Sequence, residues 1–452
     1  MSRPPAARAG GDAPAALAVV LHTHMPYVEG FGTWPFGEEW LWEAIACCYL
    51  PLLDVLDTAP GRVTLSVTPV LGDQLEAPGA LDRCLAFLRE IRPASHALDL
   101  PAATPAEAAA LEHSAAAYAR AADALAPGDL PRRLARHATW TSAATHAVLP
   151  LLATNAGIRL QLATGIAAHR ARSGGWGGGF WLPECAHAPW LDPLLAQAGA
   201  RIACVDLTDA APGATAPLRT PGGPVLVPLD RPALELVWSR GGYPARGAYR
   251  DTHRLTERRH QVWAVDGGAY DPARGTAQAR ADAAEFVARI QALGRFCCVA
   301  WDTELLGLHW HEGVQFLAAV LEAADAAGLR IAPLDELVAE AEPVPARIDA
   351  VTSWGAPRTL DTWSAPRARG LAWRQRRAEL RALPGGSPRA LRELLALQSS
   401  DWAFLAAHGT AGAYPMERAA GHEAALEAAL ADGSAAAPAV RDLAPYLTSI
   451  DG

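Results

Sequence analysis

The chain has 452 residues, and its 39 basic residues are all arginine because the sequence contains no lysine. This composition excludes enzymes that depend on a lysine side chain, such as Schiff-base aldolases, pyridoxal-phosphate enzymes and nucleotide-binding proteins with a P-loop lysine. A formal net charge of −9 argues against nucleic-acid binding, which needs a basic excess to neutralise phosphates.

Strands and helices alternate over most of the chain. A tail over residues 1–14, rich in Pro, Ala and Gly, is expected to be disordered. The hydrophobic pattern predicts strands at residues 16–22, 62–67, 179–182, 201–205, 224–228, 234–238, 296–301 and 329–332, and helices at 38–56, 105–125, 131–170, 276–293 and 313–327. This order predicts a parallel α/β sheet or barrel over residues 15–341, with a helical insertion around residues 105–170.

A Pro-rich run at residues 342–347 marks a domain boundary. Beyond it the pattern is almost wholly helical, with helices expected at 370–382, 387–397, 400–408, 415–431 and 437–448. The sequence therefore predicts a second, α-helical domain over residues 342–452.

The seven cysteines show no C-x-x-C spacing, which favours reduced thiols over a disulfide framework or a zinc ribbon. The apolar stretch at residues 15–21 is too short to span a membrane and lacks the basic start of a signal peptide. We therefore expect a cytoplasmic protein without membrane or nucleic-acid partners. The sequence is compatible with a monomer.

Two histidines, His22 and His24, end the first predicted strand. Residues two apart on a strand share a face, so these side chains point to the same side of the sheet. In a parallel barrel, the carboxyl ends of the strands form the active site. Both a metal site and a set of hydrogen bonds to substrate hydroxyls fit this pair.

Two carboxylates follow other predicted strands, and each has a tryptophan nearby. Glu184 follows Trp181, and Asp302 directly follows Trp301. Two carboxylates at separate strand ends suit glycosidic-bond chemistry, in which one attacks or stabilises the sugar and the other protonates the leaving oxygen. The 15 tryptophans, against 8 Tyr and 8 Phe, also favour a carbohydrate site, because indole faces stack on sugars. The alternative is that both carboxylates cap helices or pair with arginines.

Nine segments, in order along nearly the whole chain, resemble the family 57 glycoside hydrolases and in particular their 1,4-α-glucan branching enzymes. These segments are LHTHMPYV (21–28), EEWLWEAI (38–45), SVTPVLGDQL (66–75), ATHAVLPLL (144–152), FWLPECA (180–186), VWSRGGYP (237–244), WDTELLG (301–307), TSWG (352–355) and QSSDWAF (398–404). The resemblance implies an incomplete (β/α)7 barrel followed by an α-helical C-terminal domain that completes the cleft. It also implies a retaining mechanism and no metal or cofactor.

The same resemblance assigns roles to residues. It implies that Glu184 is the catalytic nucleophile and Asp302 the general acid/base. The expected substrate-binding residues are His22, His24, Trp40, His146, Trp181, Tyr243, Trp301, Trp354, Asp401 and Trp402. Of these, the two histidines would bind sugar hydroxyls, Trp40, Trp354 and Trp402 would stack on sugars, and Tyr243 would steer the acceptor.

Three segments depart from the family pattern. Leu308-His309 stands where branching enzymes usually have His-Trp, and His187 where the family commonly has Tyr. The segment between residue 239 and the helix near residue 276 is unusually short, although it keeps Gly242-Tyr243-Pro244 and Tyr249-Arg250. A shortened lid is expected to admit water to the glycosyl-enzyme, because closing loops normally exclude it.

The sequence thus predicts a retaining enzyme that acts on an α-1,4-glucan and transfers a glucan segment to a 6-hydroxyl group. One alternative is an α-1,4-glucan hydrolase or 4-α-glucanotransferase, which the short lid favours. A second is a metal-dependent polysaccharide deacetylase or hydrolase built on His22, His24 and a strand-end aspartate. A third is a non-catalytic glucan-binding protein, for which the altered Leu308-His309 is the only sign.

Overall fold

The computed structural model describes residues 15–364, 366–432 and 440–448, so the predicted disordered tail lies outside the described residues. Its central sheet has the strand order β4-β3-β2-β1-β8, with β9 also paired to β1, and every neighbouring pair is parallel. The strands are β1 (Ala16–Thr23), β2 (Thr64–Val67), β3 (Ala138–Ser142), β4 (Phe180–Trp181), β8 (Phe296–Asp302) and β9 (Arg330–Ile331).

A second sheet continues this one. Its order is β10-β6-β7-β5, formed by β5 (Ile202–Val205), β6 (Leu218–Arg219), β7 (Val225–Pro228) and β10 (Val344–Pro345). Ile202 of β5 bridges Gly179, next to β4, in parallel, and β5 is parallel to β7. The parallel strands therefore follow one another as β8-β1-β2-β3-β4-β5-β7, which confirms the predicted incomplete (β/α)7 barrel.

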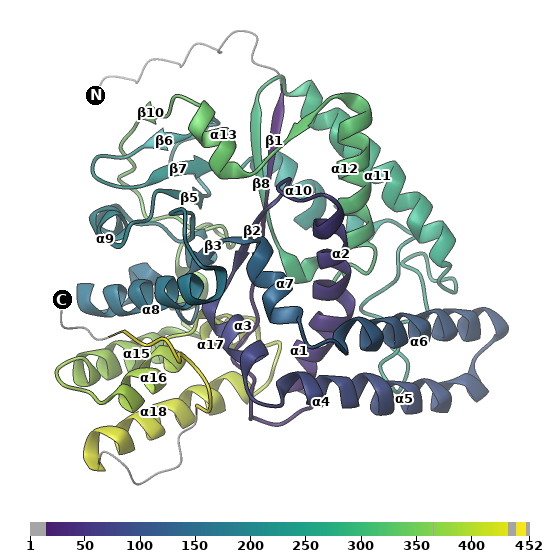
Figure 1. Cartoon of the computed structure of the whole chain (residues 1–452), viewed down its shortest axis with the longest axis horizontal. Coiled ribbons are helices and arrows are strands. Elements are labelled where there is room, and N and C mark those ends of the chain that lie inside the picture. Colours follow the sequence, from purple (N-terminus) through teal and green to yellow (C-terminus); the bar gives the residue numbers. More distant parts are fainter. Residues whose placement is uncertain (1–14, 365, 433–439, 449–452) are drawn as a thin grey trace.

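Helices cover the outside of the barrel and build the C-terminal part (Figure 1). The barrel helices are α1 (Glu38–Ala44), α2 (Leu50–Thr58), α3 (Pro69–Glu76), α4 (Ala80–Ala86), α5 (Arg92–Asp99), α6 (Pro105–Leu125), α7 (Leu130–His137), α8 (Asn155–Ser173), α9 (Asp192–Ala198), α10 (Arg231–Trp238), α11 (Pro272–Ala292), α12 (Gly313–Ala327) and α13 (Leu334–Glu340). The C-terminal helices are α14 (Asp361–Ser364), α15 (Arg369–Ala382), α16 (Pro388–Leu397), α17 (Ser400–His408) and α18 (Tyr414–Asp432). Figure 1 shows α5 and α6 projecting together to one side, away from α15 to α18.

The sequence of the two central strands explains why they lie in the middle of the barrel. All but one residue of β1 (ALAVVLHT) and all but the two end residues of β8 (FCCVAWD) are buried. Such continuous apolar runs are typical of parallel strands covered on both faces. Polar residues appear only where these strands end, so the strand ends are the place for chemistry.

Three predicted elements are wrong. Residues 234–238 are not a strand but the end of α10, which Asp230 caps by accepting a hydrogen bond from the Ala233 backbone N–H at 3.1 Å. The predicted helix over 131–170 is interrupted by β3, whose Trp140 and Thr141 prefer strands over helices. The described residues 440–448 are not helical, and the backbone N–H of Ala444 instead donates to Asp73 at 2.8 Å.

The predicted boundary at 342 falls beside the second sheet. Val344 of β10 pairs with Leu218 of β6, and Thr352 pairs with His187, so the chain still runs along the barrel there. The helical region begins only afterwards, with α14. Residues 342–354 therefore connect the two parts and also line the barrel.

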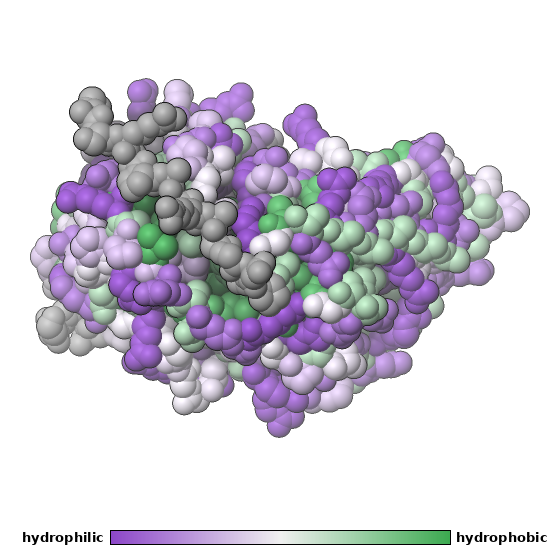
Figure 2. All heavy atoms as spheres, turned by 90° about the horizontal axis from the view of Figure 1, so that it is seen from above, coloured by the Kyte–Doolittle hydropathy of each residue, from purple (hydrophilic) through white to green (hydrophobic). Residues whose placement is uncertain are grey.

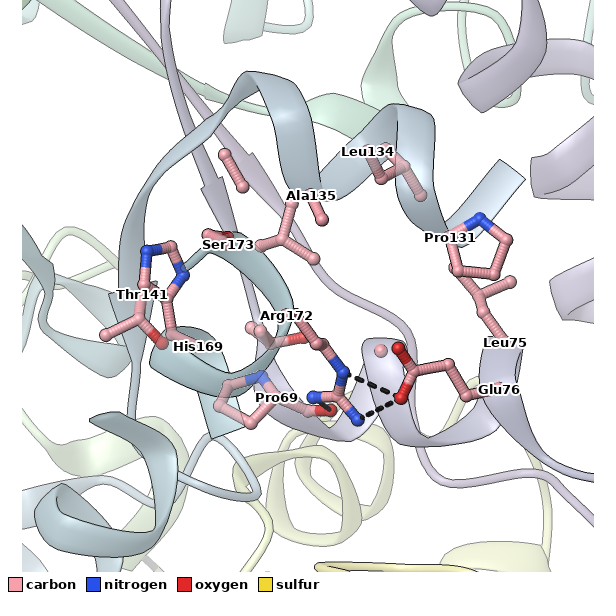
Figure 3. A pocket seen from close by; sticks show the side chains of 14 residues that line it. Pro69, Leu75, Glu76, Pro131, Leu134, Ala135, Thr141, His169, Arg172 and Ser173 are labelled. Carbon is pink, nitrogen blue, oxygen red and sulfur yellow. Dashed lines mark hydrogen bonds and ion pairs between the residues drawn. The ribbon is translucent and has the colours of Figure 1, made fainter. Parts of the chain in front are cut away.

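A small recess between α3, α7 and α8 shows how these helices are tied together (Figure 3). Arg172 of α8 pairs with Asp73 at 2.6 Å and with Glu76 at 2.9 Å, both on α3. The recess has a volume of about 30 Å³, close to that of a water molecule. Its role is therefore structural.

Polar residues cover most of one face of the molecule, and hydrophobic residues show mainly in recesses between them (Figure 2). None of the described helices is both long enough and apolar enough to cross a membrane. All seven cysteines are free.

Candidate active site

The carboxyl ends of β1 and β8 bring the first two predicted site residues side by side. His22 of β1 is in register with Asp302 of β8. The next residues on both strands, Thr23 and Thr303, are joined through their hydroxyl groups at 2.7 Å. The neighbouring strand ends therefore hold His22 and Asp302 at one edge of the sheet.

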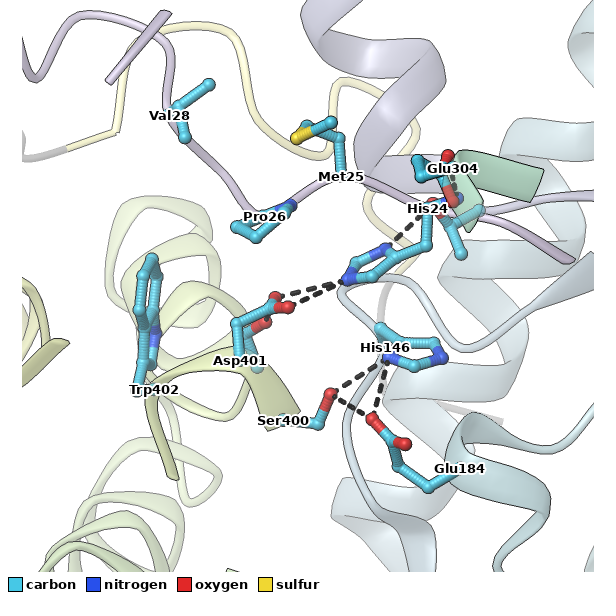
Figure 4. A network of polar contacts seen from close by, with 12 residues as sticks. His24, Met25, Pro26, Val28, His146, Glu184, Glu304, Ser400, Asp401 and Trp402 are labelled. Carbon is cyan, nitrogen blue, oxygen red and sulfur yellow. Dashed lines mark hydrogen bonds and ion pairs between the residues drawn. The ribbon is translucent and has the colours of Figure 1, made fainter. Parts of the chain in front are cut away.

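Glu184 lies in the turn after β4, where its φ is +61°. A non-glycine residue in this left-handed region stores roughly 1–3 kcal/mol of strain, which the surrounding structure must hold. Its Oε1 accepts a hydrogen bond from the Ser400 hydroxyl at 3.0 Å, and its Oε2 accepts one from Trp354 Nε1 at 3.2 Å. His146 Nδ1 lies 3.7 Å from Oε1 (Figure 4). Two donors from separate segments therefore hold the carboxylate, and the His146 ring lies beside it.

Three histidines form a stack at the centre of the site. The His22 and His146 Nε2 atoms are 2.9 Å apart, and the His24 and His146 rings are 4.2 Å apart. Burial, together with the neighbouring histidines, lowers the pKa of both His22 and His146. These two imidazoles are therefore neutral at pH 7.

The pKa of His24 is shifted upward, in contrast to the lowered pKa values of His22 and His146. Its Nε2 lies 3.0 Å from Asp401 Oδ1 and its Nδ1 lies 3.1 Å from the Thr68 hydroxyl (Figure 4). Burial opposes protonation, but the negative charges of Asp401, Glu304 and Glu184 outweigh it and raise the pKa of His24. The same pair lowers the pKa of Asp401. His24 is thus the histidine of the cluster that is protonated most readily.

The environments of Glu184 and Asp302 make both carboxyl groups weak acids. Burial and then the charge of Asp302 raise the pKa of Glu184 to about 7. Burial and then the charge of Glu304 raise the pKa of Asp302 to about 7. With these pKa values, both groups are partly protonated near neutral pH. Glu184 has two hydrogen-bond donors that stabilise its charged form, so protonation favours Asp302.

Two residues of the site were not predicted from the sequence. Glu304 accepts hydrogen bonds from the Tyr49 hydroxyl at 2.6 Å and from the His24 backbone N–H at 3.0 Å. Ser400 reaches both Glu184 and His146, the latter at 2.9 Å. Both residues lie inside segments that carry predicted site residues, WDTELLG and QSSDWAF. Their closeness in sequence to Asp302 and Asp401 was the signal that could have identified Glu304 and Ser400 as site residues.

Two of the predicted tryptophans lie beside the catalytic cluster, and a third lies further away. The Trp181 ring stacks on His22 with 4.5 Å between ring centroids, and Trp354 packs edge-on against Trp181 at 5.0 Å. Trp40 is half-buried and packs against Phe36 and Tyr414. Trp181 and Trp354 thus form the wall behind His22 and Glu184.

Three other predicted substrate-binding residues lie in the core. Trp301 is fully buried against Phe286 and Phe316, because adjacent residues on a strand point to opposite faces and Asp302 takes the cleft side. Tyr243 is buried against the same Phe316. Trp402 is fully buried and donates to the Ala396 carbonyl at 2.8 Å, on the far side of Asp401 from His24 in Figure 4. All three side chains are buried, but so are those of His22 and Trp181, so their part in substrate binding stays a prediction.

The metal-site alternative has no support in the geometry. Within residues 15–364, 366–432 and 440–448, no group of three or more His, Cys, Asp or Glu side chains is placed to hold a metal ion. His22 and His24 instead bond to His146 and Asp401.

Comparisons with known proteins agree with this arrangement. Residues 139–227 match the model of glycosyl hydrolase family 57, and residues 378–443 match that of the 1,4-alpha-glucan branching enzyme C-terminal domain. A probable 1,4-alpha-glucan branching enzyme of Mycobacterium tuberculosis is 32% identical, with 90% of each chain covered. The chain belongs to glycosyl hydrolase family 57.

Solved structures of this family superpose on the whole chain. A branching enzyme of Thermococcus kodakarensis has a TM-score of 0.86 at 27% identity, with 96% of this chain and 95% of that chain covered. The branching enzyme of Pyrococcus horikoshii has a TM-score of 0.84 at 27% identity, with 90% and 88% covered. The barrel and the helical C-terminal part are therefore both features of the family.

The segment predicted to be a shortened lid, residues 239–271, packs beside the barrel. The Thr256 hydroxyl donates to Asp99 of α5 at 2.6 Å, and Trp263 Nε1 donates to Glu107 of α6 at 2.9 Å. Arg258 adds an ion pair to Asp99 at 2.7 Å. The segment is therefore tied to the projecting α5–α6 pair.

Proposed function

We propose that the protein is a retaining 1,4-α-glucan branching enzyme. This proposal is based on the different environments of two carboxyl groups, Glu184 after β4 and Asp302 at the end of β8. Glu184 receives hydrogen bonds from Ser400 and Trp354, which favour its ionised form, whereas Asp302 faces the negative charge of Glu304, which favours its protonated form. A nucleophile and an acid with these properties are what a double displacement requires.

In the first step, Glu184 attacks the anomeric carbon of an α-1,4-glucan, and the bond from that carbon to the leaving oxygen breaks. Asp302 gives its proton to that oxygen, so the shortened glucan leaves with a free 4-hydroxyl group. In the second step, Asp302 takes the proton of the acceptor's 6-hydroxyl group, whose oxygen displaces Glu184 from the anomeric carbon. The new bond is an α-1,6 branch, and both carboxyl groups return to their initial states.

The remaining residues of the site bind and orient the sugar in this proposal. The neutral His22 and His146 offer hydrogen bonds to sugar hydroxyls, and the readily protonated His24, held by Asp401, stabilises negative charge on oxygens at the reacting centre. Trp354 lies against Glu184, and Trp40 lines the neighbouring groove, where its aromatic face suits a sugar. No cofactor takes part in the reaction as proposed.

Hydrolysis is the second candidate, because the segment 239–271 is short and docks on α5 and α6. The Mycobacterium tuberculosis alignment spans 480 positions but only 90% of this 452-residue chain, so the relative contains residues that this chain lacks. If the missing residues cover the cleft in relatives, water reaches the glycosyl-enzyme more easily here. We expect transfer to dominate, with some hydrolysis.

Linkage analysis of the products from linear amylose separates these activities. We expect new 1,6-linkages to outnumber new reducing ends, whereas the reverse result would identify a hydrolase. Glu184→Gln is expected to abolish both products while the protein remains folded, because it removes the nucleophile but keeps the side-chain shape. The surface substitution Glu417→Gln is the control and should leave both products unchanged.

We also propose that the enzyme works in the cytoplasm as a monomer on a glycogen-like polysaccharide. The seven free cysteines, six of them buried, support a reducing compartment. Protein isolated from cells under thiol-blocking conditions is expected to carry seven free thiols and to elute as a single chain.

A further inference from the structure

A large groove lies beside the catalytic cluster, between α1, α6, the segment 239–271 and the chain that follows Asp302. Its volume is about 700 Å³, which is ample for one or two sugar rings. Gly307, Leu308 and His309 form part of its wall, only a few residues beyond Asp302 and Glu304. The groove therefore borders the proposed active site without containing either carboxylate.

Arg250 lines this groove, and two nitrogens of its guanidinium group have no hydrogen-bond partner within the part of the chain that the structure describes. The side chain is only 6% exposed, and its Nε and Nη2 atoms have no hydrogen-bond partner among the described residues. The guanidinium lies 4.4 Å from the centre of the Tyr270 ring, and the Arg250 backbone N–H donates to Glu312 at 3.1 Å, so the residue is firmly placed. The Tyr270 ring and the charge of Glu312 act on the guanidinium, yet two of its buried nitrogens have no acceptor in the described parts of the chain, which favours a ligand that supplies one.

The charges around the groove favour an anion. Its lining includes five arginines and three carboxylates. Two of these carboxylates already have partners, since Glu43 pairs with Arg92 at 2.8 Å and Asp54 pairs with Arg133 at 3.0 Å. Arg120 and Arg259 are exposed at the rim, so the groove has an excess of positive charge.

The other lining groups favour a sugar. His113 and His311 lie next to Arg250, and burial followed by its positive charge lowers the pKa of both, so their neutral rings can bond to hydroxyl groups. Trp34 is 59% exposed, and Trp40 lies at the same groove. Exposed indole faces beside hydroxyl-binding groups are typical of carbohydrate sites.

We propose that this groove binds a sugar that carries an oxyanion, either a phosphate ester or a carboxylate, with Arg250 as its bidentate partner. Binding of such a sugar does not depend on the proposed function. Only the idea that the bound sugar belongs to a glucan substrate rests on it. An acceptor or regulator that carries such a group would sit next to the proposed catalytic carboxylates.

Calorimetric titration of the full chain tests the proposal. We use the Glu184→Gln variant, so that no turnover occurs, with glucose 6-phosphate, glucuronate, inorganic phosphate and maltotetraose as probes. We expect one or both anionic sugars to bind, and Arg250→Met to weaken that binding by roughly 10- to 100-fold, as expected for loss of buried charge-assisted hydrogen bonds. Maltotetraose binding should not change.

Arg254→Met is the matched control. Arg254 belongs to the same segment, but its guanidinium lies over Trp263 and outside the groove. Binding of only glucose 6-phosphate would identify the phosphate ester, and binding of only glucuronate would identify the carboxylate. Binding of inorganic phosphate alone, or equal weakening by both substitutions, would overturn the proposal.

Thermal unfolding provides a second readout. Arg250→Met loses the contact with the Tyr270 ring but also removes two buried N–H donors that have no acceptor in the described chain, so its melting temperature should change little. If that variant does not fold, a double variant in which Arg120 and Arg259 at the exposed rim are both replaced by Ala tests the proposal instead. We expect it to bind the anionic sugar at least roughly 3-fold more weakly. Absence of branching activity with intact anion binding would contradict only the proposed function. Intact branching activity without anion binding would contradict only this inference.

Discussion

The residue that distinguishes the two carboxyl groups of the site is Glu304. It lies two residues after Asp302 and is held by Tyr49 and by the backbone of His24. Its own pKa is raised to about 7, first by burial. Because it is fixed beside Asp302, its charge opposes ionisation of Asp302 and keeps the proton where an acid is needed.

Replacing Glu304 by Gln should therefore change the pH profile. Without the negative charge, Asp302 loses its proton at a lower pH, and the alkaline limb of activity should move down by roughly 0.5–1 pH unit. Glutamine keeps an oxygen for Tyr49 and His24, so the fold should be retained. The profile of branching rate between pH 5 and 9 tests this, with Glu417→Gln as control, and an unmoved alkaline limb would disprove the role of Glu304.

The raised pKa of Asp302 also affects stability. A carboxyl group whose pKa is about 7 when folded and near 4 when unfolded favours the folded state at low pH, and this contribution is lost as the pH rises through 7. Asp302→Asn should thus abolish turnover yet stabilise the protein at pH 8 by up to about 4 kcal/mol, with little effect below pH 4. Urea unfolding at both pH values measures the difference, and equal effects at both would contradict the assigned pKa.

At the scale of elements, the segment 239–271 and helix α5 depend on each other. The segment has little regular structure, and Asp99 at the end of α5 binds it twice, through Thr256 and Arg258. Asp99 is only 8% exposed and Arg258 is 40% exposed, so the contact with Thr256 is the better shielded of the two. This anchor keeps one wall of the 700 Å³ groove in place.

Asp99→Ala should loosen the segment without unfolding the barrel. Loss of two partly buried hydrogen bonds, roughly 1–2 kcal/mol, corresponds to about a 5- to 30-fold increase in local opening. Arg254, Arg258 and Arg259 offer cleavage sites, so tryptic cleavage within 254–259 should accelerate by that factor. Glu112→Ala on the exposed side of α6 is the control, and equal cleavage rates in both variants would rule out the anchor.

At the scale of the whole molecule, the site is completed only where the helical C-terminal part meets the barrel. Ser400 and Asp401 of α17 reach Glu184 and His24 of the barrel. The contact is secured by Glu379 of α15, which is fully buried and accepts hydrogen bonds from the Ala153 and Thr154 backbone N–H groups at 2.9 and 2.8 Å. Gln398 donates to the same carboxylate at 3.0 Å.

Glu379→Ala should destabilise the protein by about 3–5 kcal/mol, because several buried donors lose their acceptor at once. It should also lower branching activity in the variant that remains folded, since α17 loses its fixed position relative to Glu184. Urea unfolding and amylose branching measure the two effects. Glu417→Ala, on the exposed side of α18, should change neither, and wild-type stability of Glu379→Ala would refute the role of this contact.

Much of this architecture is predictable from local patterns. Apolar runs that end in His22, Glu184 and Asp302 identify both the strands and the polar edge of the sheet. Trp301 and Asp302 are adjacent on one strand, so their side chains point to opposite faces of the sheet. The strand β3 was hidden in an Ala-rich stretch, where helix propensity is high but the pairing with β2 and β4 prevails.

The sequence by itself predicted the alternating strands and helices, the polar strand ends and the helical C-terminal part, because the periodicity of apolar residues is a local property. The incomplete (β/α)7 barrel and the roles of Glu184 and Asp302 were implied by the resemblance to family 57. Only the tertiary structure decided which side chains meet those carboxylates. Ser400, Asp401 and Trp354 come from segments far along the chain, and Tyr243 and Trp402 turn into the core instead. The contacts of a site depend on how distant faces pack, and no local pattern of residues specifies that packing.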